Sequence, residues 1–215
     1  MTAKTASKVF DYRALRLLIG IIAFALPIVV SIVSSSTLSS ISASYHTEAR
    51  DFLVGMLFIV SAFFMAYNGH TTTQAWASKL ASIAAMMVAL FPTSCDTCDS
   101  DIISIIHYSA AVVLFSILAY FCFGPFREKT KGQEGKKGLR SKIYFACGCI
   151  MVGCLVIIGL SEILLSGETQ KAWRITYWGE AIALAAFGVA WIVAGKYFKV
   201  FVDKQDMLQG FITTS

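Results

Sequence analysis

The sequence predicts an all-α fold, a polytopic membrane bundle of six transmembrane helices with both termini in the cytoplasm. The composition is the first reason: 57% of the 215 residues are hydrophobic and 14% are charged, whereas a soluble domain has about 25% charged residues. The second reason is that the apolar residues fall in blocks of about 20, the length that a helix needs to cross the hydrocarbon core. The third is that the basic residues lie between these blocks. We therefore expect a single transmembrane domain over residues 1–215.

The apolar blocks set the expected helices. They are placed at about residues 16–33, 51–67, 80–91, 102–123, 143–165 and 175–194. The first contains an unbroken apolar run at 17–26, and Pro27 is expected to kink it. Asn68 and Gly69 close the second with a typical stop signal. Pro92 ends the third, which is the shortest.

Breaker residues and charged segments also bound the expected helices in the second half of the chain. Gly124 and Pro125 stop the fourth helix, and a basic loop at 127–142 leads to the fifth. This loop has the composition to attract anionic lipid headgroups, although a plain topology signal is the simpler interpretation. A polar tail with scattered apolar residues follows the sixth helix, as in an interfacial segment.

The lysines and arginines set the orientation. Fifteen fall on one side of the expected helices and three, Arg50, Lys171 and Arg174, on the other. Because Lys and Arg are enriched in cytoplasmic loops, the first side is assigned to the cytoplasm and the protein to the cell (inner) membrane. The same bias explains the net charge of +5, which is therefore no sign of a nucleic-acid partner. If the first helix were instead a cleaved signal peptide, the other helices would keep this orientation.

The cysteines divide by location. Four lie in expected helices, where cysteine is a small packing residue: Cys122, Cys147, Cys149 and Cys154. Cys95 and Cys98 form a CxxC pair in an expected external loop. A single CxxC resembles a redox or metal half-site. We favour a disulfide that staples the loop, or a pair of free thiols.

Ionisable side chains inside a bilayer are costly and are candidates for function. At a rise of about 1.5 Å per residue, four of them fall in one layer near the outer boundary, each on a different helix: Asp51, His107, Glu162 and Glu180. Arg50, His46 and Glu48 lie beside this layer. Each member of the layer shares its helix face with small residues, which is typical of packed faces in membranes. We predict a polar cavity that opens outward. The alternative is structural, with these groups serving as helix caps, ion pairs and a packing histidine.

Three functions fit such a layer. In the first, the outward-facing pocket binds a lipid headgroup, a small polar ligand or a metal ion, and Arg50 attracts an anionic group. In the second, the protein is a metal-dependent membrane hydrolase that uses His107 with Asp51 or Glu180. The three-histidine site of ceramidase-type hydrolases cannot be carried over, because no histidine follows His107. In the third, the chain is a structural partner subunit of a membrane complex. Membrane lipids, a membrane protein or a second copy are the expected partners, and the cofactor stays open.

A family resemblance adds to these expectations. It rests on the stretch SASYHTEARDFLVG at 42–55, on AYNG at 66–69 and on FPT at 91–93. With His107 and Glu180, these residues resemble a family of uncharacterised bacterial six-helix membrane proteins over most of the chain. The resemblance implies a cell-membrane location, and its motifs overlap with the predicted pocket. In architecture alone, the chain is also similar to the DRAM/Sfk-type six-helix membrane proteins that are linked with lipid handling.

Overall fold

The chain folds into an all-α bundle in a computed structural model that describes residues 12–94 and 102–202. The long helices are α1 (Tyr12–Val33), α2 (Arg50–Ala66), α3 (Thr72–Leu90), α4 (Ile102–Phe123), α5 (Gly135–Leu164) and α7 (Ile175–Gly195). The short elements are the 3-10 helix η1 (Ser42–His46), the helix α6 (Gly167–Trp173) and the 3-10 helix η2 (Lys199–Phe201).

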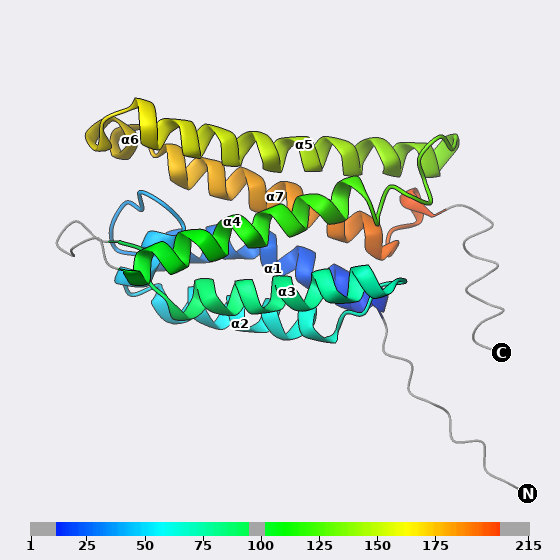
Figure 1. Ribbon diagram of the computed structural model, residues 1–215, viewed down its shortest axis with the longest axis horizontal. Helices are drawn as coiled ribbons and strands as arrows, with labels where there is room; N and C mark the ends of the chain where they lie inside the picture. The colour runs from blue at the N-terminus through cyan, green and yellow to red at the C-terminus, as the bar shows by residue number, and fades with distance from the viewer. Residues whose placement is uncertain (1–11, 95–101, 203–215) are drawn as a thin grey trace, which may run out of the picture.

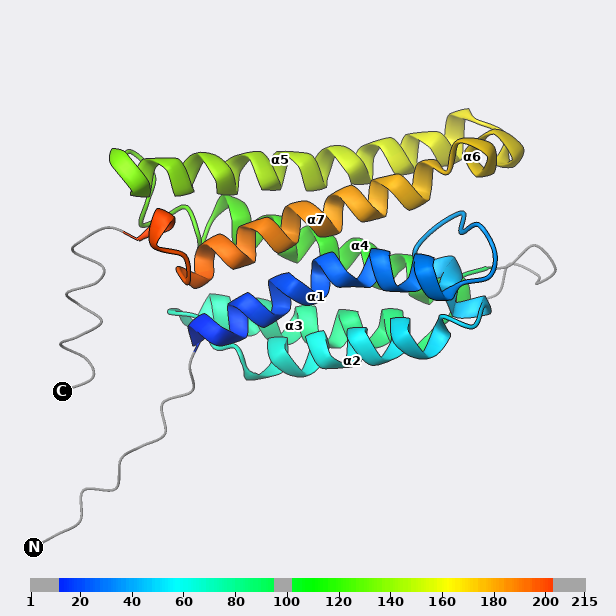
Figure 2. The same cartoon turned by 180° about the vertical axis from the view of Figure 1, so that it is seen from behind.

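The six long helices run side by side in three layers (Figure 1). Helices α5 and α7 form the first layer, α4 and α1 the middle one, and α3 and α2 the third, and the view from behind shows the same order (Figure 2). Each helix packs against two neighbours in the order α1, α7, α5, α4, α3, α2 and back to α1. The bundle is therefore a closed ring. We call the end that carries η1 and α6 the loop end, and the end where α1 begins and α7 stops the terminal end.

Four of the helices described by the structure are long and apolar enough to cross a membrane: α1, α4, α5 and α7. Helix α2 is apolar but only 17 residues long. Helix α3 has 19 residues and is more polar, with a buried Gln74 and with Lys79 in its sequence. The coarse expectation of a helical membrane protein is therefore met.

Two helices start earlier than the hydropathy pattern predicts. Helix α3 begins at Thr72 instead of near residue 80, because the Thr71 hydroxyl caps it by accepting a hydrogen bond from the Gln74 amide at 3.2 Å. Helix α5 begins at Gly135 instead of 143, so that part of the expected basic loop is helical. Hydropathy marks only the apolar part of a helix, and polar first turns beyond that part escape it.

Helices α1 and α7 approach each other closely at two glycines. A Cβ atom on Gly20 would lie 2.6 Å from Ile192 Cγ1 and 2.8 Å from the Gly188 carbonyl oxygen. A Cβ atom on Gly188 would lie 2.7 Å from the Phe24 ring. Small residues let membrane helices pack with their backbones in contact. The ring of helices thus closes at a contact that has no room for a side chain.

Serine hydroxyls join α2 to α3 in the interior. Ser61 donates to the Ser82 carbonyl at 2.9 Å, and Ser82 donates back to the Ser61 carbonyl at 2.8 Å. Ser78 donates to the Phe64 carbonyl at 2.7 Å. All three serines are buried, and interhelical hydrogen bonds of this kind contribute about 0.6 kcal/mol each in membrane proteins. These hydrogen bonds satisfy polar side chains of α3 that face α2.

The α1–α7 contact gives the first prediction. Gly20→Ala should lower the free energy of unfolding by about 1–3 kcal/mol, because the added methyl group must displace Ile192 or the α7 backbone. The measurement is the thermal midpoint in detergent micelles. Gly153→Ala is the matched control, since a Cβ there meets no atom within 4 Å. Equal midpoints for the two variants would contradict the close contact.

Candidate functional site

At the loop end, residues 34–49 form a cap that joins α1 to α2. The carboxylate of Glu180, from α7, accepts a hydrogen bond from the Ile41 amide at 2.5 Å and two weaker ones from Ser42, from its amide at 3.4 Å and its hydroxyl at 3.3 Å. These amides open the helix η1. The first N–H groups of a helix lack intrahelical partners and favour a negative charge. Glu180 therefore fastens the cap to α7.

Two further groups from α7 hold the same cap. Arg174 Nε donates to the Leu38 carbonyl at 2.8 Å, and the Tyr177 amide donates to the Ser39 carbonyl at 3.0 Å. Arg174 joins α6 to α7 in the left-handed conformation, with φ 51°, and its guanidinium lies 4.0 Å from the centre of the Tyr177 ring. Arg174 and Tyr177 thus satisfy carbonyls of the cap, and Glu180 satisfies its amides.

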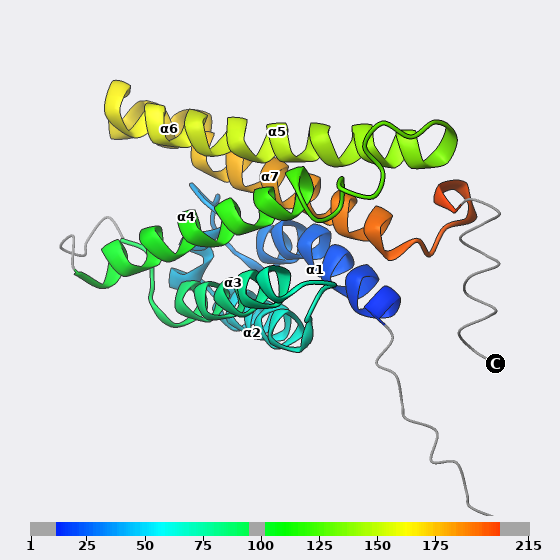
Figure 3. The ribbon, with the colours of Figure 1, turned by 45° about the vertical axis from the view of Figure 1, so that its right-hand side comes forward.

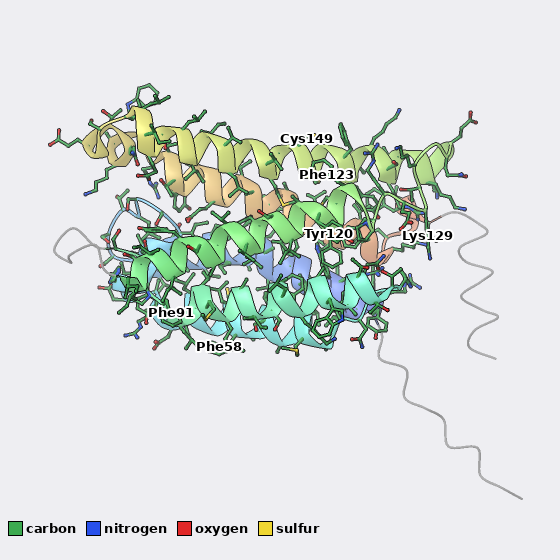
Figure 4. All side chains as sticks on the ribbon, in the orientation of Figure 1. Phe58, Phe91, Tyr120, Phe123, Lys129 and Cys149 are labelled. Carbon is green, nitrogen blue, oxygen red and sulfur yellow. The ribbon has the colours of Figure 1, made fainter. Side chains whose placement is uncertain are left out.

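Two histidines hold the segment that follows α3. His46 Nε2 donates to the Thr93 carbonyl at 2.8 Å, and His107 Nδ1 donates to the Phe91 carbonyl at 2.7 Å. Phe91 lies at the loop end, just after α3 (Figure 4). Because a carbonyl oxygen only accepts, each bond requires the proton on the named ring nitrogen. His107 is buried and His46 is exposed.

Glu48 closes the cap on its solvent side. Its carboxylate accepts from the Ser35 hydroxyl at 2.9 Å and from the Ser35 amide at 3.3 Å. A hydrogen bond from its own backbone and then those from Ser35 lower the pKa of the exposed Glu48 carboxyl. A lowered pKa means that this contact stabilises the fold above the ordinary pKa of glutamate and is lost as the pH falls through the lowered value.

Besides the exposed His46 and Glu48, three of the predicted site residues lie on the surface. Arg50 lies over the Tyr45 ring, with the guanidinium carbon 4.5 Å from the ring centre, and donates to the Tyr45 hydroxyl at 2.9 Å. Asp51 is exposed beside it, and no hydrogen bond reaches its carboxylate from the described residues. Glu162 is exposed near the end of α5.

The structure therefore divides the predicted layer into fastening groups and surface groups. Glu180, Glu48, His46 and His107 hold non-helical backbone, whereas Arg50, Asp51 and Glu162 face outward. Within residues 12–94 and 102–202, no three His, Cys, Asp or Glu side chains are grouped to hold a metal ion. The predicted pair Cys95 and Cys98 lies outside the described residues.

The role of Arg174 and Tyr177 was not predicted from the sequence. Arg174 was assigned only as a charge of the outer side, and the pattern around both residues contains no signal for a contact with residues 38–39, more than 130 positions away. Such contacts become visible only when α1 and α7 are known to be neighbours.

Comparisons of the chain with protein-family models, with curated proteins and with solved structures give no match. The resemblance to bacterial six-helix membrane proteins stays a prediction. What the site can do is therefore argued from its geometry.

The cap contact gives the second prediction. Glu180→Ala should speed hydrogen exchange of the Ile41 and Ser42 amides about 10- to 100-fold, because a hydrogen bond to a charged group is worth about 1.5–3 kcal/mol and 1.4 kcal/mol is a factor of ten. Exchange of residues 34–49 is read by mass spectrometry. Glu162→Ala, which removes an exposed carboxylate at the same end of the bundle, should leave the cap unchanged. Unchanged exchange in the Glu180 variant would show that the carboxylate does not hold the cap.

Proposed function

We propose that the protein spans the cell (inner) membrane six times, with both termini in the cytoplasm, and binds a zwitterionic phospholipid headgroup with its outer face. The observation that carries the proposal is Arg50, exposed at the start of α2 and held against the Tyr45 ring, with an exposed Asp51 at the next position. The headgroup that fits this pair has a phosphate and a primary ammonium.

The packing of the helices supports the six crossings. Helices α2 and α3 complete the ring between α1 and α4, and they lie side by side, tilted relative to α5 (Figure 3). Their backbone is satisfied within each helix, as a span requires. The terminal end holds both the start of α1 and the end of α7, since Arg13 Nε donates to the Gly195 carbonyl at 3.3 Å. Most of the lysines and arginines are expected on that side, which supports a cytoplasmic position for it.

The Arg50 side chain is well suited to a phosphate. The ring and the hydroxyl of Tyr45 hold the guanidinium. Because Tyr45 is uncharged, this contact does not neutralise Arg50, and most of the five N–H donors of Arg50 are left for a ligand. Arginine binds phosphate oxygens with two parallel hydrogen bonds. Tyrosine is enriched at the membrane–water interface, the depth of phospholipid headgroups.

Asp51 gives the pair its selectivity. Its exposed carboxylate, one position further along the start of α2, offers a negative partner to the ammonium of a bound headgroup. A phosphatidylethanolamine headgroup has this order of charges, whereas phosphatidylglycerol carries no ammonium. The fastened cap keeps Tyr45 in place, since η1 is held by Glu180 and His46. A preorganised site loses less entropy on binding.

The other two candidate functions have less support. A metal-dependent hydrolase needs a set of ligands, and the described residues contain no such group. A partner subunit without a ligand would leave the Arg50–Asp51 pair without a role. Lipid binding by the purified chain distinguishes this function from the headgroup site.

The third prediction concerns lipid binding, measured by native mass spectrometry of the purified full chain titrated with phosphatidylethanolamine or phosphatidylglycerol. Arg50→Gln should weaken both lipids about tenfold, the effect of about 1.4 kcal/mol from one lost charged hydrogen bond. Asp51→Asn should weaken phosphatidylethanolamine alone.

Glu162→Gln, which changes another exposed carboxylate of the loop end, serves as the control and should bind as the wild type does. Equal binding by the wild type and by Arg50→Gln would overturn the headgroup site. A wild type that retains neither lipid would favour the partner subunit.

A further inference from the structure

At the terminal end, Trp191 of α7 lies at the centre of an aromatic cluster. Its side chain is 0% exposed, and five rings surround it at centroid distances of 5.2–5.8 Å: Phe64, Tyr67, Phe121, Phe126 and Phe187. The indole Nε1–H has no hydrogen-bond partner within the described part of the chain. A buried N–H without an acceptor costs about 1–3 kcal/mol, so an acceptor that binds this N–H would stabilise the fold.

Arg16 of α1 brings a cation to the same cluster. Its guanidinium carbon lies 5.2 Å from the centre of the Tyr67 ring and 5.8 Å from that of Phe126, two rings that also flank Trp191. Nη1 donates to the Ala194 carbonyl at 2.9 Å, and Nη2 donates to the Tyr67 hydroxyl at 2.6 Å. The buried Nε–H has no acceptor among residues 12–94 and 102–202.

Tyr67 adds a third donor. Its side chain is 1% exposed, and its hydroxyl oxygen accepts from Arg16, so the hydroxyl hydrogen must be donated elsewhere. The described residues offer it no acceptor. The cluster therefore holds three donors, Arg16 Nε–H, Tyr67 O–H and Trp191 Nε1–H, and a positive charge.

The described residues do not neutralise this charge. The partners of Arg16 are a carbonyl and a phenol, and the described acidic residues of the α4–α5 connection, Glu128 and Glu134, are exposed. Burial and then the cations Lys129, Arg16 and Lys196 lower the pKa of His70, in the connection from α2 to α3. Lys129 lies at the same end (Figure 4). Three cations therefore act on His70 at this end of the bundle.

We infer that this cluster binds a small monovalent inorganic anion of the halide class. Such an ion only accepts hydrogen bonds, and it would take all three donors while it offsets the Arg16 charge. A water molecule would bring two donors of its own into a site that has donors in excess. A lipid phosphate would need access from the surface, yet Arg16 Nε and Trp191 Nε1 are shielded from it. This site lies at the other end of the bundle from Arg50 and does not depend on the headgroup proposal.

The inferred ion would connect helices that close the ring. Arg16 lies on α1, Tyr67 directly after α2 and Trp191 on α7. Any ligand that binds only the folded state raises its stability. The protein should therefore be more stable in chloride than in gluconate, which is too large for such a site.

The test is thermal unfolding of the full chain in detergent micelles, followed by circular dichroism in chloride–gluconate mixtures of constant ionic strength. The wild-type midpoint should rise with chloride and saturate, and bromide should act in the same way. Tyr67→Phe deletes one donor and keeps the ring, so about tenfold more chloride should be needed, the equivalent of about 1.4 kcal/mol. Trp191→Phe should act similarly, and Arg16→Gln should abolish the effect.

Two control variants carry the same chemical changes at exposed positions. Tyr197→Phe and Trp76→Phe should keep the wild-type chloride dependence. A wild-type midpoint that is equal in chloride and gluconate would overturn the anion site and leave water as its occupant. Chloride dependence that survives unchanged in both Tyr67→Phe and Trp191→Phe would also overturn it.

Discussion

The close contact of α1 with α7 is the constraint on which the rest of the structure depends. Gly20 and Gly188 bring the two backbones together near mid-helix, and this contact turns an open row of helices into a closed ring. Hydrogen bonds secure it at both ends: Arg16 reaches the Ala194 carbonyl at 2.9 Å, and the Ser31 and Tyr177 hydroxyls meet at 2.6 Å. The loop-end cap and the terminal-end aromatic cluster are both built on this pair of helices.

The ionisable groups at the loop end follow from a rule of membrane structure. Non-helical backbone near the hydrocarbon region must find partners inside the protein. The cap and the segment after α3 are such backbone, and Glu180, His107 and His46 supply partners to their amides and carbonyls. A layer of polar residues at one depth thus arises because two connections turn there, and it does not need a common ligand. Arg50 and Asp51 are exposed and do not hold these connections to the helices.

The two ends of the bundle differ in how their polar groups are satisfied. At the loop end, carboxylates and histidines meet backbone donors and acceptors in matched numbers. At the terminal end, buried donors exceed acceptors among the described residues, around Arg16 and Trp191. A surplus of buried donors beside a positive charge is unfavourable unless an acceptor joins it. One end thus forms a fastened connection, whereas the other keeps buried donors for which the described residues supply no acceptor.

Composition and hydropathy were enough to place the apolar helices. The bounds of α4 and the stop of α2 followed from apolar runs and breaker residues, because these are local properties. The early starts of α3 and α5 were not predicted, because the polar turns before the apolar part of each helix give no hydropathy signal. The partner of each polar group was decided only by tertiary structure. The basic residues of the cytoplasmic side were predicted only as topology signals and Glu180 as part of a cavity, because periodicity reports the face of a helix but not which helix or loop lies against it.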